Sequence, residues 1–293
     1  MPYLMSSGPA RAGHLGVARH LLGSRLRALR EKKKIPRSDA AKHIGSSAPT
    51  ISRIELGQVA VKERDLERLL QLYGVTDSSQ RLAYLQLAHQ LSARPWWHPH
   101  KDLLAGWLCS YLALESVADL IRSYENRFIP GLLQTRSYAE AVIRQDGAAR
   151  GRDLHRRVDV RMNRQQRILE RNAALWAVVD EATLSNQTAG PAVMREQIDF
   201  LISMAGAERR EISIQVLPVK KSAIAAAANS FSILRLRIHN LQDVVYLEQL
   251  NSALFLDDPS DCDPYNTAWS RLTVEANEPR KTVEILRQAR NKL

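Results

Sequence analysis

Cysteine is almost absent from this chain of 293 residues, and its two cysteines, Cys109 and Cys262, lie far apart. Two isolated thiols provide neither a disulfide framework nor a zinc site, so we interpret them as buried side chains of a cytoplasmic protein. The sequence also lacks any run of about eighteen apolar residues, which excludes a transmembrane helix. The first residues lack the apolar segment of a secretory signal, and we expect a disordered leader over residues 1–16.

Motifs for catalysis are missing as well. The sequence has no phosphate-binding loop, no nucleophile elbow and no HExxH zinc motif, and the histidines of WWHPH lack a third ligand at metal spacing. The acidic pairs Asp180-Glu181 and Asp257-Asp258 could bind a metal or divide acid and base roles. Each pair follows a predicted strand, however, where acidic residues commonly cap the next helix. We therefore expect no enzyme activity, no catalytic residues, no bound metal and no cofactor.

Basic residues are in excess, with 42 Lys and Arg against 31 Asp and Glu, and the excess is unevenly placed. Residues 1–91 hold 15 of the basic and 7 of the acidic residues, whereas the remaining 202 residues carry a net charge of only +3. A basic module at one end of a chain is typical of proteins that bind the phosphates of nucleic acids.

The segment Ile35–Gly57, IPRSDAAKHIGSSAPTISRIELG, predicts two short helices joined by a tight turn. Apolar residues recur at helical spacing up to Gly45, which suits the left-handed end of a first helix. A serine can then cap a second helix, with Pro49 in its first turn. Ile51 and Ile54 would face inward, so that the polar face of the second helix could enter a DNA major groove.

The wider segment Leu21–Val75 resembles the XRE-type, repressor-like helix-turn-helix family, with SAPTISRIELG at the position of that family's serine cap, central motif and closing glycine. The resemblance implies an all-α five-helix DNA-binding domain, which we place over residues 17–92. Candidate flanking helices are LGSRLRALREKKK before the motif, and VKERDLERLLQLYGV and SSQRLAYLQLAHQL after it.

Positions within the motif predict which residues bind DNA, with the recognition helix over Ser47–Leu56. Arg53 is expected to read bases, because its forked donors match guanine O6 and N7, and a phosphate contact is the alternative. Arg37 stands where the family tends to have a glutamine that touches phosphate. Pro36 occupies the usual serine cap of the first helix. The predicted DNA-binding residues are Arg37, Ser47, Ala48, Pro49, Thr50, Ser52 and Arg53.

Two neighbours of these residues have other expected roles. Glu55 is interpreted as structural, since an anion would not approach phosphates. Lys32–Lys34 should add attraction that does not depend on DNA sequence. Ala48 and Pro49 offer only apolar contacts to bases, and the resemblance implies polar readers at those positions in many relatives, so the operator sequence is not predicted.

The second half, residues 93–293, is expected to be an α+β domain that begins after a break near Ser92–Pro99. Strands are predicted at 175–179, 212–218, 230–236, 243–249 and 252–256, and helices at 101–116, 137–144, 154–171, 193–205 and within 263–293. The segment 120–128 is ambiguous between helix and strand. The arginine-rich run RGRDLHRRVDVRMNRQQRILER has two interpretations, an ordinary solvated helix or a surface for nucleic acid or an acidic partner.

This half also resembles the regulatory domain behind such helix-turn-helix units in actinobacterial proteins, through segments such as VDVRMNRQQRIL and VVYLEQLNSALFLDDP. The resemblance implies an antitoxin-like transcription regulator. We expect a nucleoid-associated homodimer on double-stranded DNA, with the second domain serving dimerisation and sensing. The alternative is a protein that binds and neutralises a small neighbouring partner, with DNA binding for autoregulation.

Overall fold

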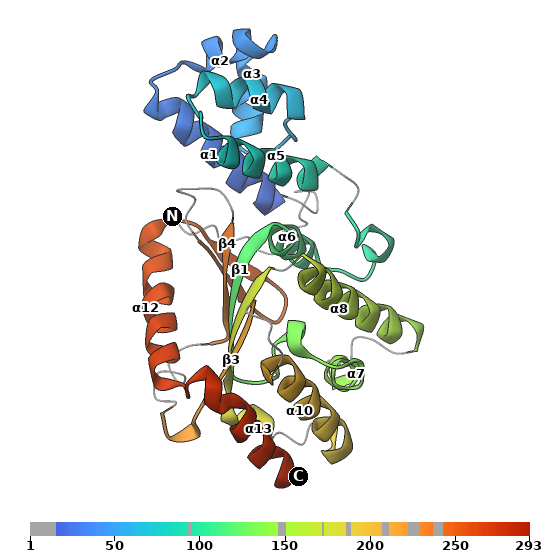
Figure 1. Cartoon of the computed structure of the whole chain (residues 1–293). Helices are drawn as coiled ribbons and strands as arrows, with labels where there is room; N and C mark the ends of the chain where they lie inside the picture. Colours follow the sequence, from blue (N-terminus) through green and yellow to red (C-terminus); the bar gives the residue numbers. More distant parts are fainter. Residues whose placement is uncertain are drawn as a thin grey trace. The chain divides into compact units, whose positions relative to one another are not determined.

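The computed structural model describes most of the chain, over residues 16–92, 95–145, 151–171, 173–185, 189–206, 211–221, 229–236 and 243–293. The chain forms two compact units, Leu4–Ala118 with Arg235–Asp243, and Asp119–Leu234 with Val244–Leu293. The fold class expected from the sequence is confirmed: helices come first, and a mixed sheet with helices follows (Figure 1). The predicted leader lies outside the described residues, apart from Gly16.

The first unit is helical, and its first five helices agree with the sequence prediction. They are α1 (Gly16–Lys32), α2 (Arg37–Ile44), α3 (Ala48–Glu55), α4 (Glu63–Leu72) and α5 (Ser78–Ser92). Each presents one apolar face to a shared core, which includes Leu22, Leu26, Ile51, Leu66, Leu69, Leu70 and Tyr73. This packing stabilises helices of only eight to ten residues, such as α2, α3 and α4, which are too short to be stable alone.

The unit continues through a short 3-10 turn, η1 (His98–His100), into α6 (Gly106–Glu115), which contacts α1. A helix over 101–116 was expected, and its predicted start is wrong. A succession of tight turns that begins at Pro95 continues past residue 101: Lys101 N–H donates to His98 C=O at 3.3 Å and Leu103 N–H donates to His100 C=O at 2.9 Å. Because this unit includes α6, the domain boundary that we expect at residue 93 stays a prediction.

The second unit is built on a six-stranded sheet in the order β3-β2-β1-β4-β5-β6. Strands β1, β2 and β3 are parallel, whereas β4, β5 and β6 pair antiparallel to one another. The strands are β1 (Ala118–Glu125), β2 (Ala174–Asp180), β3 (Ile212–Leu217), β4 (Phe231–Leu236), β5 (Val244–Glu248) and β6 (Ala253–Leu256). The ambiguous segment 120–128 is thus a strand as far as Glu125, where β1 ends, and β1 lies in the middle of the sheet.

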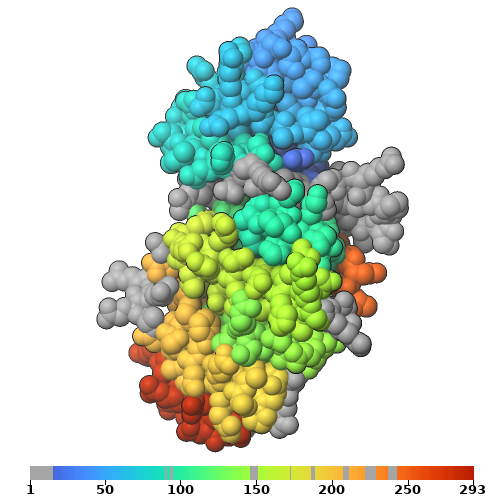
Figure 2. Space-filling view, turned by 90° about the vertical axis from the view of Figure 1, so that its right-hand side faces the viewer, coloured from blue at the N-terminus to red at the C-terminus, as the bar shows by residue number. Residues whose placement is uncertain are grey.

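Helices cover both faces of this sheet (Figure 1). One face packs against α12, and the other lies under α7, α8 and α10, the helical face seen in Figure 2. The helices of this unit are α7 (Arg136–Gln145), α8 (Arg152–Glu170), α9 (Glu181–Leu184), α10 (Pro191–Gly206), α12 (Pro259–Glu275) and α13 (Thr282–Asn291), with the 3-10 turns η2 (Gly131–Leu133), η4 (Val219–Lys221) and η5 (Pro279–Lys281).

The α12 face is apolar, and it includes the cysteine predicted to be buried. Its core gathers Tyr124, Val178, Leu217, Phe231, Ile233, Val245, Leu256, Cys262, Trp269 and Leu272. Cys262 and, in the first unit, Cys109 are both fully buried free thiols, as the sequence predicts. Burial raises the pKa of Cys109 to about 11, so this thiol stays protonated and unreactive at neutral pH.

Candidate nucleic-acid interface

The turn between α2 and α3 has the geometry expected from the sequence. Gly45 ends α2 in the left-handed conformation, at φ 67° and ψ 41°, and Ser46 N–H donates to Ala41 C=O at 2.8 Å. Ser47 precedes α3 in an extended conformation, and Pro49 lies in the first turn, where no backbone donor is needed. The chain therefore passes from α2 to α3 through a short turn, and the two helices contact each other.

Glycine lets α1 approach the back of α3 closely. A Cβ atom at Gly23 would collide with the carbonyl oxygens of Ile54 and Glu55, so any larger residue would push the two helices apart. Ile51 and Ile54 are buried on the same inward side of α3. The position of α3 is thus fixed from behind, and its opposite side faces outward.

The outward side of α3 carries the predicted base-reading residues. Ser47, Pro49 and Arg53 are exposed, while Ala48, Thr50 and Ser52 are partly exposed. Three of these residues interact along the helix: the Ser47 and Thr50 hydroxyl oxygens are 3.0 Å apart, and Arg53 Nη2 donates to Thr50 Oγ1 at 3.3 Å. Ser47 occupies the cap position without a side-chain bond to the backbone. The result is a small polar surface with one cationic fork at its end.

A buried carboxylate ties α3 to α1 and α2. Arg30 donates through Nε to Glu55 Oε1 at 2.5 Å and through Nη2 to Oε2 at 3.0 Å, and Arg37 Nε donates to Oε2 at 3.0 Å. The Glu55 side chain is 2% exposed and that of Arg30 is 7% exposed, whereas that of Arg37 is 42% exposed. The bond to Glu55 raises the pKa of Arg30 above its ordinary value. Glu55 is therefore structural, as expected, and Arg37 lies beside it at the start of α2.

Arg30 was not identified from the sequence, although it completes this cluster through a further bond from Nη1 to Ile35 C=O at 2.9 Å. The available signal was Glu55, an acidic residue next to the inward-facing Ile54. A carboxylate at such a position needs a buried cation, and the basic residue can only come from another helix.

Positive charge also gathers at the end of α1. Lys32, Lys33 and Lys34 are all exposed where α1 meets the segment leading to α2. Lys34 takes a left-handed conformation, with φ 55°, and its N–H donates to Glu31 C=O at 2.9 Å. This turn joins the lysines to Pro36, which caps α2 without a side-chain bond, as expected.

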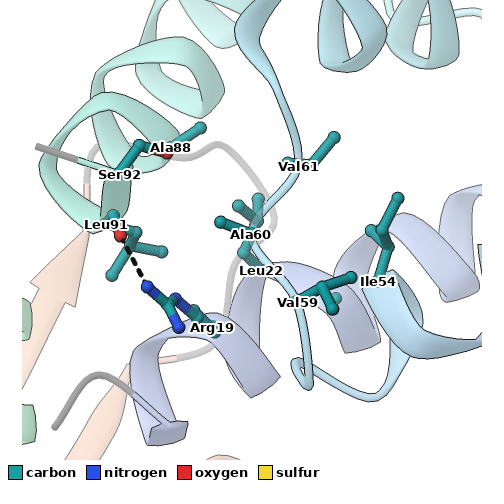
Figure 3. A pocket seen from close by; sticks show the side chains of 10 residues that line it. Arg19, Leu22, Ile54, Val59, Ala60, Val61, Ala88, Leu91 and Ser92 are labelled. Atoms are coloured by element: carbon teal, nitrogen blue, oxygen red, sulfur yellow. Dashed lines mark hydrogen bonds between the residues drawn. The ribbon is translucent and has the colours of Figure 1, made fainter. Parts of the chain in front are cut away.

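A small hollow lies behind the motif (Figure 3). Apolar side chains form most of it, and Arg19 at its edge donates through Nη2 to Leu91 C=O at 3.2 Å. Its lining consists of Arg19, Leu22, Gly23, Ile54, Val59, Ala60, Val61, Ala88, Leu91 and Ser92. Ile54 is an inward residue of α3, so the hollow belongs to the scaffold and not to the outward surface.

The acidic pairs considered for catalysis have capping roles in the second unit. Asp180 begins α9 and accepts from Ala182 N–H at 2.9 Å, and Asp258 begins α12 and accepts from Ser260 N–H at 2.9 Å. This is the capping interpretation favoured by the sequence. In the described part of the chain, no group of three or more His, Cys, Asp or Glu side chains could hold a metal ion. None of the described helices is long and apolar enough to cross a membrane.

Comparison with known families agrees with this geometry. Residues 21–82 match the family model of a helix-turn-helix domain, so fold and sequence together define a helix-turn-helix regulator of the DNA-binding class. Residues 108–288 match the family model described as a domain of unknown function, DUF5753. This match covers more than half of the chain, which therefore belongs to the DUF5753 family. No curated protein and no solved structure matches the chain.

Proposed function

We propose that this protein is a sequence-specific transcription regulator that places α3, flanked by Ser47 and Leu56, in the DNA major groove. The observation that carries the proposal is the outward face of α3, where Arg53 is exposed and is hydrogen-bonded through one nitrogen to Thr50. The other donors of the guanidinium can form the forked pair to guanine O6 and N7, while Ala48 and Pro49 offer apolar contacts to a thymine methyl.

Phosphate binding falls to the basic residues around α3. The bond from Arg37 Nε to Glu55 fixes the guanidinium plane, and its two Nη groups remain for a phosphate oxygen. Because the Arg37 guanidinium is already held in place before DNA binds, the entropic cost of its contact with phosphate is lower. Lys32, Lys33 and Lys34 would add salt-dependent attraction.

The second unit is proposed to dimerise the protein and to receive a signal, without catalysis. A single motif of this size buries too little surface for strong specificity, which favours two copies on a pseudo-palindromic site in the nucleoid. A signal would act by changing the spacing or mobility of the two DNA readers. Sedimentation of the full chain tests the dimer, and a purely monomeric protein at micromolar concentration would contradict it.

The test of DNA reading is binding to the DNA upstream of the protein's own gene, with excess competitor DNA, over a series of salt concentrations. Arg53→Ala should lose most of its preference for the specific site, about 1–3 kcal/mol, yet keep much of the salt dependence. Arg81→Ala, in α5, is the matched control and should behave as wild type. If wild type itself shows no preference over competitor, this site is not the operator. If Arg53→Ala weakens all DNA equally, Arg53 contacts phosphate and does not read bases.

Binding of a small partner protein by the second unit stays a prediction. A pull-down with the full chain tests it directly. A stoichiometric small protein retained by wild type would favour this role, and a clean pull-down from the native host would count against it.

A further inference from the structure

A local group of polar residues lies on the sheet face opposite α12. Side chains alternate between the faces of a strand, so the residues beside those of the apolar α12 core point to the face under α7 and α8. Many of these residues are apolar and buried, such as Ile121, Ala177, Leu234 and Val244, but a polar group lies among them on β1, β4 and β5: Ser123, Glu125, Ser230, Ser232, Tyr246 and Glu248. Ser123, Ser232 and Tyr246 are buried. Polar groups buried on a sheet face are costly unless they have partners.

These polar residues converge at one edge of the sheet. Ser230 Oγ accepts from Asn126 N–H at 3.4 Å and lies 3.0 Å from Asn126 Oδ1, so β4 starts where β1 ends. Strand β5 runs antiparallel to β4 and therefore ends at the same edge. Glu125 and Glu248, the last residues of β1 and β5, are thus brought together there. Glu248 is exposed and accepts from the Tyr246 hydroxyl at 3.1 Å, so this edge opens to solvent.

This edge also lies at a change in chain topology. Strand β1 has its parallel partner β2 on one side and β4, the first antiparallel strand, on the other. In open sheets with helices on their faces, ligands bind beyond the carboxyl ends of strands where the chain order reverses. The carboxyl end of β1, with Glu125, is such a position.

Helix α8 brings arginines close enough for the charges of Glu125 and Glu248 to act on Arg161. Arg161 donates through Nη1 to Gln134 Oε1 at 2.7 Å. Arg161 Nε lies 4.0 Å and Arg164 Nη1 lies 3.8 Å from the point where a Cβ of Gly131 would be, so both guanidinium groups border one glycine. One turn earlier, Arg157 Nε is buried without a hydrogen-bond partner among the described residues. The half-buried guanidinium groups of Arg161 and Arg164 therefore lie next to each other at Gly131, which has no side chain to fill the space between them and the backbone.

These charges influence one another through space. Burial, reinforced by the charge of Arg164, lowers the pKa of Arg161 to about 10. Burial, reinforced by Glu248, raises the pKa of Glu125 to about 7. Within the described residues, Arg161 forms no ion pair with Glu125 or Glu248. The cluster therefore keeps two cations and two acids beside each other, and Arg161 is not neutralised by either acid.

We propose that this cluster is a binding site for a small zwitterion of the amino-acid class. Its carboxylate would bind Arg161 and Arg164 beside Gly131, and its ammonium group would bind Glu125 and Glu248. A simple anion would meet the two acids, and a simple cation would meet the two guanidinium groups. Only a ligand with both charges complements both halves of the site.

The proposal is tested by thermal unfolding and calorimetry on the full chain, with each of the protein amino acids as probe and without DNA. At least one should raise the Tm of wild type by about 5 °C at roughly one hundred times its Kd. The deaminated acid and the decarboxylated amine of that amino acid should each bind at least tenfold more weakly. Because DNA is absent, the outcome does not depend on the proposed regulatory function.

Substitutions in α8 and β5 test which side chains hold the amino acid. Arg161→Met should weaken binding at least tenfold and Arg161→Lys less, while Arg167→Met, an exposed position of the same helix, is the matched control. Glu248 is exposed, so we expect Glu248→Gln to fold, and it keeps the test valid if Arg161→Met unfolds. Glu248→Gln should weaken binding of the amino acid but should not weaken binding of the deaminated acid. The proposal is overturned if no amino acid binds, if the deaminated acid binds equally well, or if Arg161→Lys and Glu248→Gln bind as wild type.

Discussion

Glu55 should be the residue on which the stability of the helix-turn-helix unit depends most. Its carboxylate accepts three charge-assisted hydrogen bonds, two from Arg30 and one from Arg37. In Glu55→Ala the Arg30 guanidinium stays buried without its counter-charge. Breaking a buried pair in this way costs about 3–5 kcal/mol. Arg37 is largely exposed, so solvent screens its pair with Glu55, and Arg37→Ala should cost no more than about 1 kcal/mol.

Hydrogen exchange of the full chain, followed by mass spectrometry, measures this difference in the unit itself. If the unit opens and closes faster than its amides exchange, lowering its free energy of unfolding by about 3–5 kcal/mol speeds exchange of the α2 and α3 amides roughly 150- to 5,000-fold. Arg37→Ala should speed the same amides by less than about tenfold. Peptides from β1 to β3 serve as the internal reference and should not change in either variant.

A double substitution distinguishes the cost of leaving a buried charge without its partner from the cost of losing side-chain packing. In Arg30→Met with Glu55→Met both charges are gone and apolar volume is kept, so much of the lost protection should return. The reasoning is refuted if Glu55→Ala and Arg37→Ala have the same small effect. It is equally refuted if the double variant exchanges as fast as Glu55→Ala alone.

Two further predictions follow from local geometry and charge. Gly23→Ala should destabilise the first unit by more than about 1 kcal/mol, because its Cβ would collide with backbone oxygens of α3. Gly106→Ala is the control and should be neutral or slightly stabilising, because no atom lies within 4 Å of its Cβ. The denaturant midpoints of the two variants test this difference. Glu125 has a folded-state pKa of about 7, above its unfolded value of about 4.3, so its contribution to stability is complete below pH about 4 and is lost as the pH rises through 7. The groups that face this carboxyl are Ser230, Glu248, Arg161 and Tyr138. Glu125→Gln should remove the part of the pH dependence of stability that is due to Glu125. Equal slopes of the free energy of unfolding against pH for wild type and Glu125→Gln, between pH 5 and 8, would contradict this.

Local signals allowed the helix-turn-helix motif to be predicted almost residue by residue. Gly45 requires a left-handed conformation, Pro49 fits only the first turn of a helix, and Ile51 and Ile54 mark the inward face. Each of these signals depends on neighbours within a few positions. Strands β2 to β6 of the second unit were also predicted, because their apolar runs are short and bounded by turns, whereas the sequence of β1 is ambiguous between helix and strand.

Contacts between distant residues could not be predicted in the same way. The Arg30–Glu55 pair joins positions 25 residues apart. Helical spacing places Arg30 on the same face as Leu22 and Leu26, but it does not show that the partner of Arg30 is Glu55. Strand alternation identifies two faces of β1 but not which strand lies beside it. The placement of β1 next to β4 brings Glu125 to Ser230 and Glu248, and this depends on the fold of the whole unit.

The arginine-rich run shows why charge alone does not identify a nucleic-acid surface. Some charges of this run are paired: Asp159 accepts from Arg136 of α7 at 2.7 Å, and Arg156 lies 3.7 Å from Asp153 of the run itself. Arg161 instead turns toward Gln134 and the sheet, half-buried. An arginine contributes to phosphate binding only if it is exposed and its charge is not already balanced. By this criterion Arg53 and the lysines that end α1 are candidates and Arg161 is not, which argues for a different use of that arginine in the second unit.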